Sequence, residues 1–212
     1  MDKKDVLKML FTIEGIDGVG KTTVINTLKG MLVDYKDVIF TKEPQYFTTE
    51  QKHALVKMED PVEKLATFFL DHTKHTREVL DPNIEDKIII CDRYIHSRIA
   101  YQALEISRLY EMPLDDVIDY IEGMHYFSYW PDKVYVIWSD EELLAKRLRA
   151  RHDDMDISDM NRLLATEEVL CHVLTRGDPY SVPYVGVEMD EDGFNYSAME
   201  IYQNIVETID NS

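Results

Sequence analysis

Short apolar runs alternate with longer segments of helical periodicity along the chain. The apolar runs, each an expected strand, are residues 9–13, 37–41, 87–91, 133–138 and 182–189. Apolar residues recur at helical spacing in residues 21–32, 60–80, 93–110, 113–127, 140–152, 158–174 and 196–209. The alternation predicts one α/β domain over residues 1–212, with a mainly parallel five-stranded sheet covered by helices on both faces. Ligands are then expected outside the carboxyl ends of the strands.

The chain is acidic, with 23 Lys and Arg residues against 41 Asp and Glu residues and a formal net charge of −18. This balance argues against non-specific binding of nucleic acid, which requires a basic surface. It still permits a small phosphorylated ligand, which needs only a few local donors. Cys91 and Cys171 form no C-x-x-C motif, and no apolar segment suits a signal peptide or a membrane span. We therefore expect a reduced, cytoplasmic protein without membrane contact.

The segment GIDGVGKTT, residues 15–23, fits the phosphate-loop pattern G-x-x-x-x-G-K-[ST] in full. It follows an expected strand and opens an expected helix, which is the context that the pattern requires. Lys21 is expected to reach the β- and γ-phosphates, and the Thr22 hydroxyl to ligate Mg²⁺. The residues expected to bind the phosphates of the nucleotide are Gly15, Gly18, Gly20, Lys21, Thr22 and Thr23. A chance glycine-rich turn is the alternative; the pattern favours a three-layer P-loop NTPase fold.

An Asp-Arg pair follows the apolar run at residues 87–91. Asp92 can act on the Mg²⁺ shell, either directly or through water, and Arg93 can hold phosphate oxygens with its planar guanidinium. The alternative is a helix-capping aspartate beside a surface arginine. The nearby phosphate loop favours the functional interpretation.

A basic cluster precedes a polar stretch in the second half of the chain. Its members are Lys146, Arg147, Arg149 and Arg151, followed by HDDMDISD. Residues 147–160 could form a lid that closes over transferring phosphates, where arginines would neutralise charge and exclude water. A solvated helix face explains the cluster equally well.

Four segments in this order, EGIDGVGKTT, KEP, FFLDHTKH and DRYIHSRIAYQ, resemble the thymidylate kinases at approximately the same spacing. The resemblance covers residues 9–152, and the combination of motifs is more specific than the phosphate loop alone. It implies transfer of the ATP γ-phosphate to dTMP, giving dTDP, with Mg²⁺. It also implies a homodimer.

The resemblance also assigns roles to individual residues. Asp17 matches an aspartate near the deoxyribose and the acceptor phosphate, and Phe68 matches the aromatic residue that stacks on thymine. Arg93 matches the arginine that bridges the two phosphates, and Tyr101 matches the tyrosine that crowds the 2′ position of the sugar. Glu43, in the Glu-Pro motif that ends an expected strand, is a candidate for the acceptor site, with a turn as the alternative.

The phosphate loop lacks an arginine that some members of the family use in catalysis. Some members place a catalytic arginine after the loop aspartate, where this chain has Gly18. The lid cluster, with Arg149 and Arg151 as the expected catalytic residues, would have to supply the missing charge.

The chain departs from the family pattern at the base-binding residues. The family commonly has an arginine where this chain has His72, and a small polar residue where it has Arg98. Both His72 and Arg98 are still expected to contact the substrate. Tyr94, Arg98 and Tyr101 fall on one helical face, so Arg98 is expected to point toward the base if Tyr101 faces the sugar. Our hypothesis is that Arg98 supplies the base-edge donor that position 72 has lost.

Three alternatives remain open from the sequence. The departures at the base site could shift specificity to another or a modified deoxynucleoside monophosphate, as in a phage or other divergent member. A deoxynucleoside kinase would share the phosphate loop but take an uncharged acceptor. A non-catalytic nucleotide-binding relative would lack the reaction altogether.

Overall fold

The computed structural model describes residues 8–150, 157–177, 181–189 and 194–210. Its centre is a parallel sheet of five strands in the order β2-β3-β1-β4-β5. The strands are β1 (Met9–Glu14), β2 (Val38–Lys42), β3 (Ile88–Asp92), β4 (Lys133–Trp138) and β5 (Tyr184–Glu188). The expected α/β fold is therefore confirmed, and the described sheet is parallel throughout.

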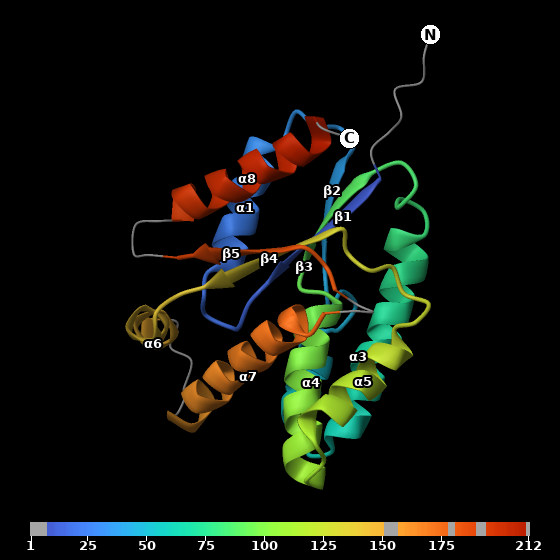
Figure 1. The fold of residues 1–212 in the computed structure, drawn as a ribbon, viewed down its shortest axis with the longest axis vertical. Helices are drawn as coiled ribbons and strands as arrows, with labels where there is room; N and C mark the ends of the chain where they lie inside the picture. The colour runs from blue at the N-terminus through green and yellow to red at the C-terminus, as the bar shows by residue number, and fades with distance from the viewer. Residues whose placement is uncertain (1–7, 151–156, 178–180, 190–193, 211–212) are drawn as a thin grey trace.

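Helices cover both faces of the sheet (Figure 1). They are α1 (Lys21–Met31), α2 (Thr49–Val56), α3 (Pro61–His75), α4 (Ile95–Tyr110), α5 (Leu114–Met124), α6 (Glu141–Ala150), α7 (Ile157–Thr175) and α8 (Phe194–Asp210). The pair α1 and α8 packs on one face, while α3, α4, α5 and α7 form a layer on the other. Short strands joined by helices keep all carboxyl ends at one edge of the sheet.

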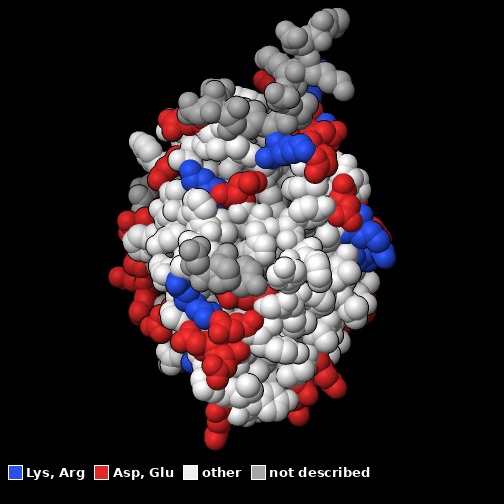
Figure 2. Space-filling model, turned by 45° about the vertical axis from the view of Figure 1, so that its right-hand side comes forward, with Lys and Arg blue, Asp and Glu red and all other residues white. Residues whose placement is uncertain are grey.

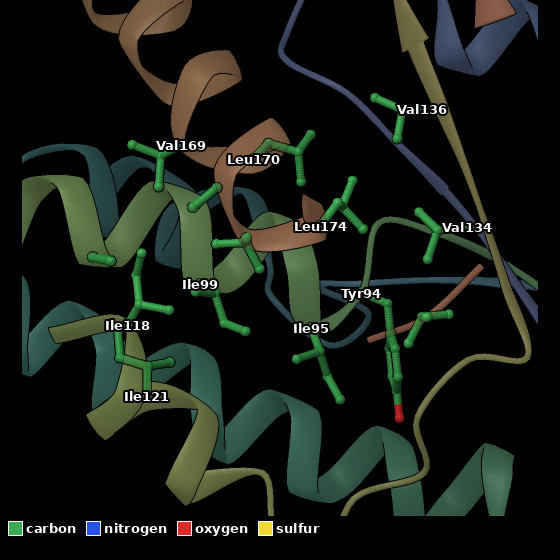
Figure 3. Packing of buried hydrophobic residues seen from close by; sticks show 14 of the residues in the cluster. Tyr94, Ile95, Ile99, Ile118, Ile121, Val134, Val136, Val169, Leu170 and Leu174 are labelled. Carbon is green, nitrogen blue, oxygen red and sulfur yellow. The ribbon is translucent and has the colours of Figure 1, made fainter. Parts of the chain in front are cut away.

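Alternate residues of each strand supply two separate apolar cores. Ile89 and Cys91 of β3 belong to a cluster with buried residues of α4, α5 and α7. Val134 and Val136 of β4 belong to the same cluster (Figure 3). Their sequence neighbours, such as Ile90, face α1 and α8. Both faces of the strands are thus buried, which explains why β3 reads as an uninterrupted apolar run.

Three local features differ from the expected elements. Helix α2 was not expected, because among its described side chains only Leu55 is buried; a capping box between Thr48 and Gln51 starts the helix. The helix expected at residues 60–80 changes to a π-helix at Thr76–Leu80. The helix expected from residue 93 begins at Ile95 instead, because Arg93 has a left-handed backbone with φ 62°.

Acidic side chains are spread over the face drawn in Figure 2, whereas basic side chains occur there in small separate groups. This distribution agrees with the acidic composition and shows no continuous basic stripe on that face. Among the described residues, no helix has both the length and the apolar character needed to cross a membrane.

Candidate functional site

The phosphate loop connects β1 to α1, as its sequence pattern requires. Gly15 and Gly18 both have positive φ, 140° and 92°. A Cβ atom at Gly15 would lie 2.3 Å from the carbonyl oxygen of Ile137, and one at Gly18 would lie 2.8 Å from side-chain carbons of Leu144 and Leu148. Conformation therefore favours glycine at both positions, and at Gly15 the fixed backbone oxygen also excludes a side chain. An arginine in place of Gly18 would strain the backbone and require the two leucine side chains to shift.

Lys21 lies folded back into the loop. Its Nζ donates hydrogen bonds to the carbonyl oxygens of Gly15 at 3.0 Å and Ile16 at 2.7 Å. Burial lowers the pKa of Lys21 to about 7, and repulsion from the Arg93 guanidinium acts in the same direction. A bound phosphate would replace these weak carbonyl partners with a full negative charge.

Arg93 occupies the turn between β3 and α4. Its backbone N–H donates to the carbonyl oxygen of Ile13 at 3.0 Å, and its carbonyl oxygen accepts from the Cys91 thiol at 3.0 Å. Its guanidinium donates to Asp17 Oδ1 at 2.8 Å and to the Ser97 hydroxyl at 3.1 Å. The left-handed backbone thus places the side chain above the ends of β1 and β3, facing the phosphate loop.

Two adjoining cavities meet at Arg93. The first, of about 200 Å³, is the phosphate-loop cavity, and it is lined by Asp17, Gly18, Gly20, Lys21, Thr22, Lys42, Glu43, Pro44, Lys52, Asp92 and Arg93. The second, of about 540 Å³, is the acceptor cavity, which extends between α3, α4 and α7. Five residues line both, namely Asp17, Glu43, Pro44, Lys52 and Arg93. This arrangement can hold two phosphorylated groups end to end.

The acceptor cavity contains both aromatic and polar side chains. Phe68 of α3 lines it and packs edge-on against Phe47, with the ring centroids 5.4 Å apart. Tyr101 lines the opposite wall on α4, and its hydroxyl donates to Asp17 Oδ2 at 3.2 Å. A flat, mostly apolar ring beside Phe68 and a polar tail toward Arg93 would match these surroundings.

Arg98 also lines the acceptor cavity and belongs to a closed hydrogen-bonded ring. The guanidinium donates to Glu43 Oε2 and, at 3.3 Å, to Nε2 of His125. His125 Nδ1 donates to the Ser128 hydroxyl at 3.1 Å, which donates to His72 Nε2 at 2.9 Å. His72 Nδ1 closes the ring by donating to Glu43 Oε1 at 2.9 Å. These tautomers are assigned from the network, which gives each donor an acceptor.

The charges in this ring are well defined. Burial, together with the neighbouring Arg98 cation, lowers the pKa of His125 to about 2, so the imidazole stays neutral. Burial opposes ionisation of Glu43, but Arg98, His72 and His75 outweigh it and hold the pKa of this carboxyl well below its usual range. The ring therefore contains one anion and one cation, both buried and both hydrogen-bonded.

His72 itself does not line either cavity; it lies behind Glu43 with both ring nitrogens engaged. The expectation that His72 contacts substrate is therefore corrected to a supporting position. Arg98 does line the acceptor cavity, and its guanidinium has five N–H groups, two of which donate in the ring.

The expected lid is only partly described. Arg147 on α6 donates to the carbonyl oxygen of Val19 at 2.8 Å, which joins this helix to the phosphate loop. Arg149 is exposed on α6 and lines neither cavity. Arg151 and residues 152–156 lie outside the described residues, so the catalytic role expected of the lid stays a prediction.

Most of the other expected site residues are brought together at the carboxyl edge of the sheet. Gly15 and Thr23 do not line either cavity: the first turns the loop and the second is exposed on α1. Sequence reasoning missed Ser97, whose hydroxyl accepts a hydrogen bond from the Arg93 guanidinium. Lys52 lines both cavities from α2.

Thr22 and Asp92 offer a hydroxyl and a carboxylate to the phosphate-loop cavity. In the part of the chain that the structure describes, no three metal-ligating side chains cluster. Mg²⁺ is commonly held by one or two such oxygens together with phosphates and waters, so the residues present fit it.

Comparison with known proteins gives the same family at several levels. Residues 13–175 match the family model described as thymidylate kinase. A probable thymidylate kinase of Methanoculleus marisnigri is 34% identical over 143 residues, which are 66% of this chain and 68% of that protein. One from Methanosarcina acetivorans is 30% identical over 165 residues, 76% of this chain and 79% of that protein. The crystal structure of thymidylate kinase from Ehrlichia chaffeensis shares the fold, with a TM-score of 0.63, 23% identity and coverage of 93% of this chain and 98% of that chain.

Proposed function

Because the chain belongs to the thymidylate kinase family and is a nucleoside monophosphate kinase, we propose that it transfers the γ-phosphoryl group of ATP to dTMP, giving ADP and dTDP. The observation that carries this proposal is the junction of the phosphate-loop cavity with an acceptor cavity at Arg93. ATP phosphates would occupy the first cavity and dTMP the second.

The transfer follows from how charge is arranged at this junction. The acceptor phosphate attacks the γ-phosphorus in line, and because it is already anionic it needs no strong general base. Lys21 and Arg93 neutralise the charge that spreads over the transferring oxygens, and lid arginines would add to them. Thr22 and Asp92 would hold Mg²⁺, which when bound would supply positive charge to the phosphates.

Recognition of the base is proposed to rest on Arg98. Its ring partners leave a donor-only guanidinium at the cavity wall, and such a group complements a carbonyl oxygen of thymine. Cytosine would instead place its exocyclic amino group, which is a hydrogen-bond donor, against the N–H donors of Arg98. Phe68 would stack on the base, and Tyr101 would limit space at the sugar.

A panel of acceptors tests the proposed reaction. With ATP and Mg²⁺, we expect dTMP to give the highest kcat/KM, with dCMP lower by about 100-fold or more because it would leave buried polar groups unmatched. Coupled ADP production with dTMP, dUMP, dCMP, dGMP and thymidine provides the measurement. A preference for thymidine would instead indicate a nucleoside kinase, and folded protein that binds ATP without any turnover would overturn the proposal.

The pKa of Lys21 predicts how ATP affinity depends on pH. Burial and the Arg93 cation lower this pKa to about 7, whereas a bound triphosphate would return it toward its ordinary value. Between about pH 7 and pH 10, binding should therefore take up a proton, and the affinity should fall as pH rises. Calorimetry near pH 8.5 in buffers of different ionisation enthalpy measures this uptake. An equal uptake by Lys21→Ala would contradict the assignment to Lys21.

A further inference from the structure

Glu14 is a buried carboxylate at the end of β1 that the proposed reaction does not use. Its side chain is fully enclosed, with 0% exposure. Burial raises the pKa of Glu14, while Ser97, Arg93 and Lys21 oppose that shift. A carboxylate in such a place is costly unless its oxygens are satisfied by donors.

Both oxygens of Glu14 accept from the turn that carries Arg93. Oε1 accepts from the backbone N–H of Tyr94 at 3.0 Å, and Oε2 accepts from the Ser97 hydroxyl. The Ser97 hydroxyl has a single hydrogen, which it donates to Glu14. Its oxygen accepts a hydrogen bond from Arg93 Nη1, which lies 3.1 Å away. The bonds therefore run in one direction, from guanidinium to hydroxyl to carboxylate.

This relay orients the guanidinium from behind. Parallel pairing of β1 and β3 places Ile13 beside Asp92, so Glu14 stands next to the turn at Arg93. The other terminal nitrogen of Arg93 is thereby directed to Asp17 in the phosphate loop, 2.8 Å away. The negative end of the relay also balances the cations Lys21 and Arg93 before any phosphate arrives.

We propose that Glu14 and Ser97 are positioning residues for phosphoryl transfer, which fix the Arg93 guanidinium between donor and acceptor phosphates through a hydrogen-bonded relay. This inference rests on the proposed function. The Glu14–Ser97 pair should therefore affect kcat as well as stability. If the Arg93 guanidinium were misdirected, it would no longer neutralise the charge that develops on the transferring phosphate in the transition state.

The test uses the full chain with ATP and dTMP. Ser97→Ala removes the acceptor for Arg93 and leaves the bond from Tyr94 to Glu14 in place; we expect kcat to fall about 10- to 100-fold, the range for a hydrogen bond to a charged group. The KM for ATP should change by less than about threefold, because the phosphate loop is untouched. Ser97→Thr should restore kcat. Ser107→Ala, on the exposed far part of α4, is the matched control and should leave kcat unchanged.

A double-variant cycle separates positioning from folding. In an Arg93→Lys background, Ser97→Ala should have little further effect on kcat, because the group that it orients is already gone. The same fold-loss in both backgrounds, or a wild-type kcat in Ser97→Ala, would overturn the proposal. Glu14→Gln is expected to lower the melting temperature as well as kcat, so the Ser97 variants provide the kinetic test.

The wild-type activity separates this inference from the proposed function. If the wild-type chain phosphorylates no acceptor, both fail together. If the wild type is active and Ser97→Ala has the same kcat, only the relay is rejected.

Discussion

Replacing Lys21 with alanine is expected to lower kcat about 1,000-fold or more, since the ammonium acts on charge that develops in the transition state. Lys21 is the buried cation of the phosphate loop, and its Nζ donates hydrogen bonds to the carbonyl oxygens of Gly15 and Ile16. Without Lys21, the transferring phosphate would lack that positive charge. Steady-state kinetics with saturating ATP and dTMP measures the loss.

The matched control is Lys36→Ala, which removes an exposed ammonium from the turn before β2. It should keep wild-type kcat. A thermal melt of Lys21→Ala with and without ATP shows whether the variant is folded. If folded Lys21→Ala retained kcat within about tenfold of wild type, the phosphate-loop assignment would be wrong.

Replacing Arg98 with serine is expected to destabilise the fold by about 3–5 kcal/mol, because it leaves Glu43 as an uncompensated buried charge. Both side chains are almost fully enclosed, at 5% and 4% exposure. The substitution also opens the ring through His125, Ser128 and His72. Urea denaturation measures the change in the free energy of unfolding.

Arg108→Ser on the same helix is the control, since Arg108 is exposed, and it should change stability by less than about 0.5 kcal/mol. If Arg98→Ser also changed the free energy of unfolding by less than about 0.5 kcal/mol, the buried Arg98–Glu43 ion pair would not contribute to stability as expected. The expected loss also means that Arg98→Ser alone mixes folding with base recognition. The double variant Glu43→Gln with Arg98→Met removes both charges and should recover part of the stability, so its ratio of dTMP to dCMP turnover reports on recognition.

Periodicity and the phosphate-loop pattern predicted the fold because they reflect local and repeating forces. The five strands and seven of the helices follow from apolar spacing, and the loop follows from glycine conformation together with its flanking elements. Helix α2 was missed because its position depends on one buried leucine and a capping box rather than on an apolar face.

The base end of the site was only partly predictable. That Tyr94, Arg98 and Tyr101 line one cavity followed from helical spacing. The position of His72 behind Glu43 did not, since it depends on Ser128 and His125, more than 50 residues further along the chain. Likewise, no local signal showed that Ser97 would lie between Arg93 and Glu14. The homodimer, the cytoplasmic location and the catalytic role of Arg149 and Arg151 stay predictions.

The contact between Gly18 and α6 limits how this chain can change over evolution. Glycine at this position has φ 92° and rests against Leu144 and Leu148. A single mutation to arginine would strain the backbone and require the side chains of these leucines to shift. Conversion to the form with a loop arginine is therefore expected to be favoured by compensating changes in α6 as well as in the loop.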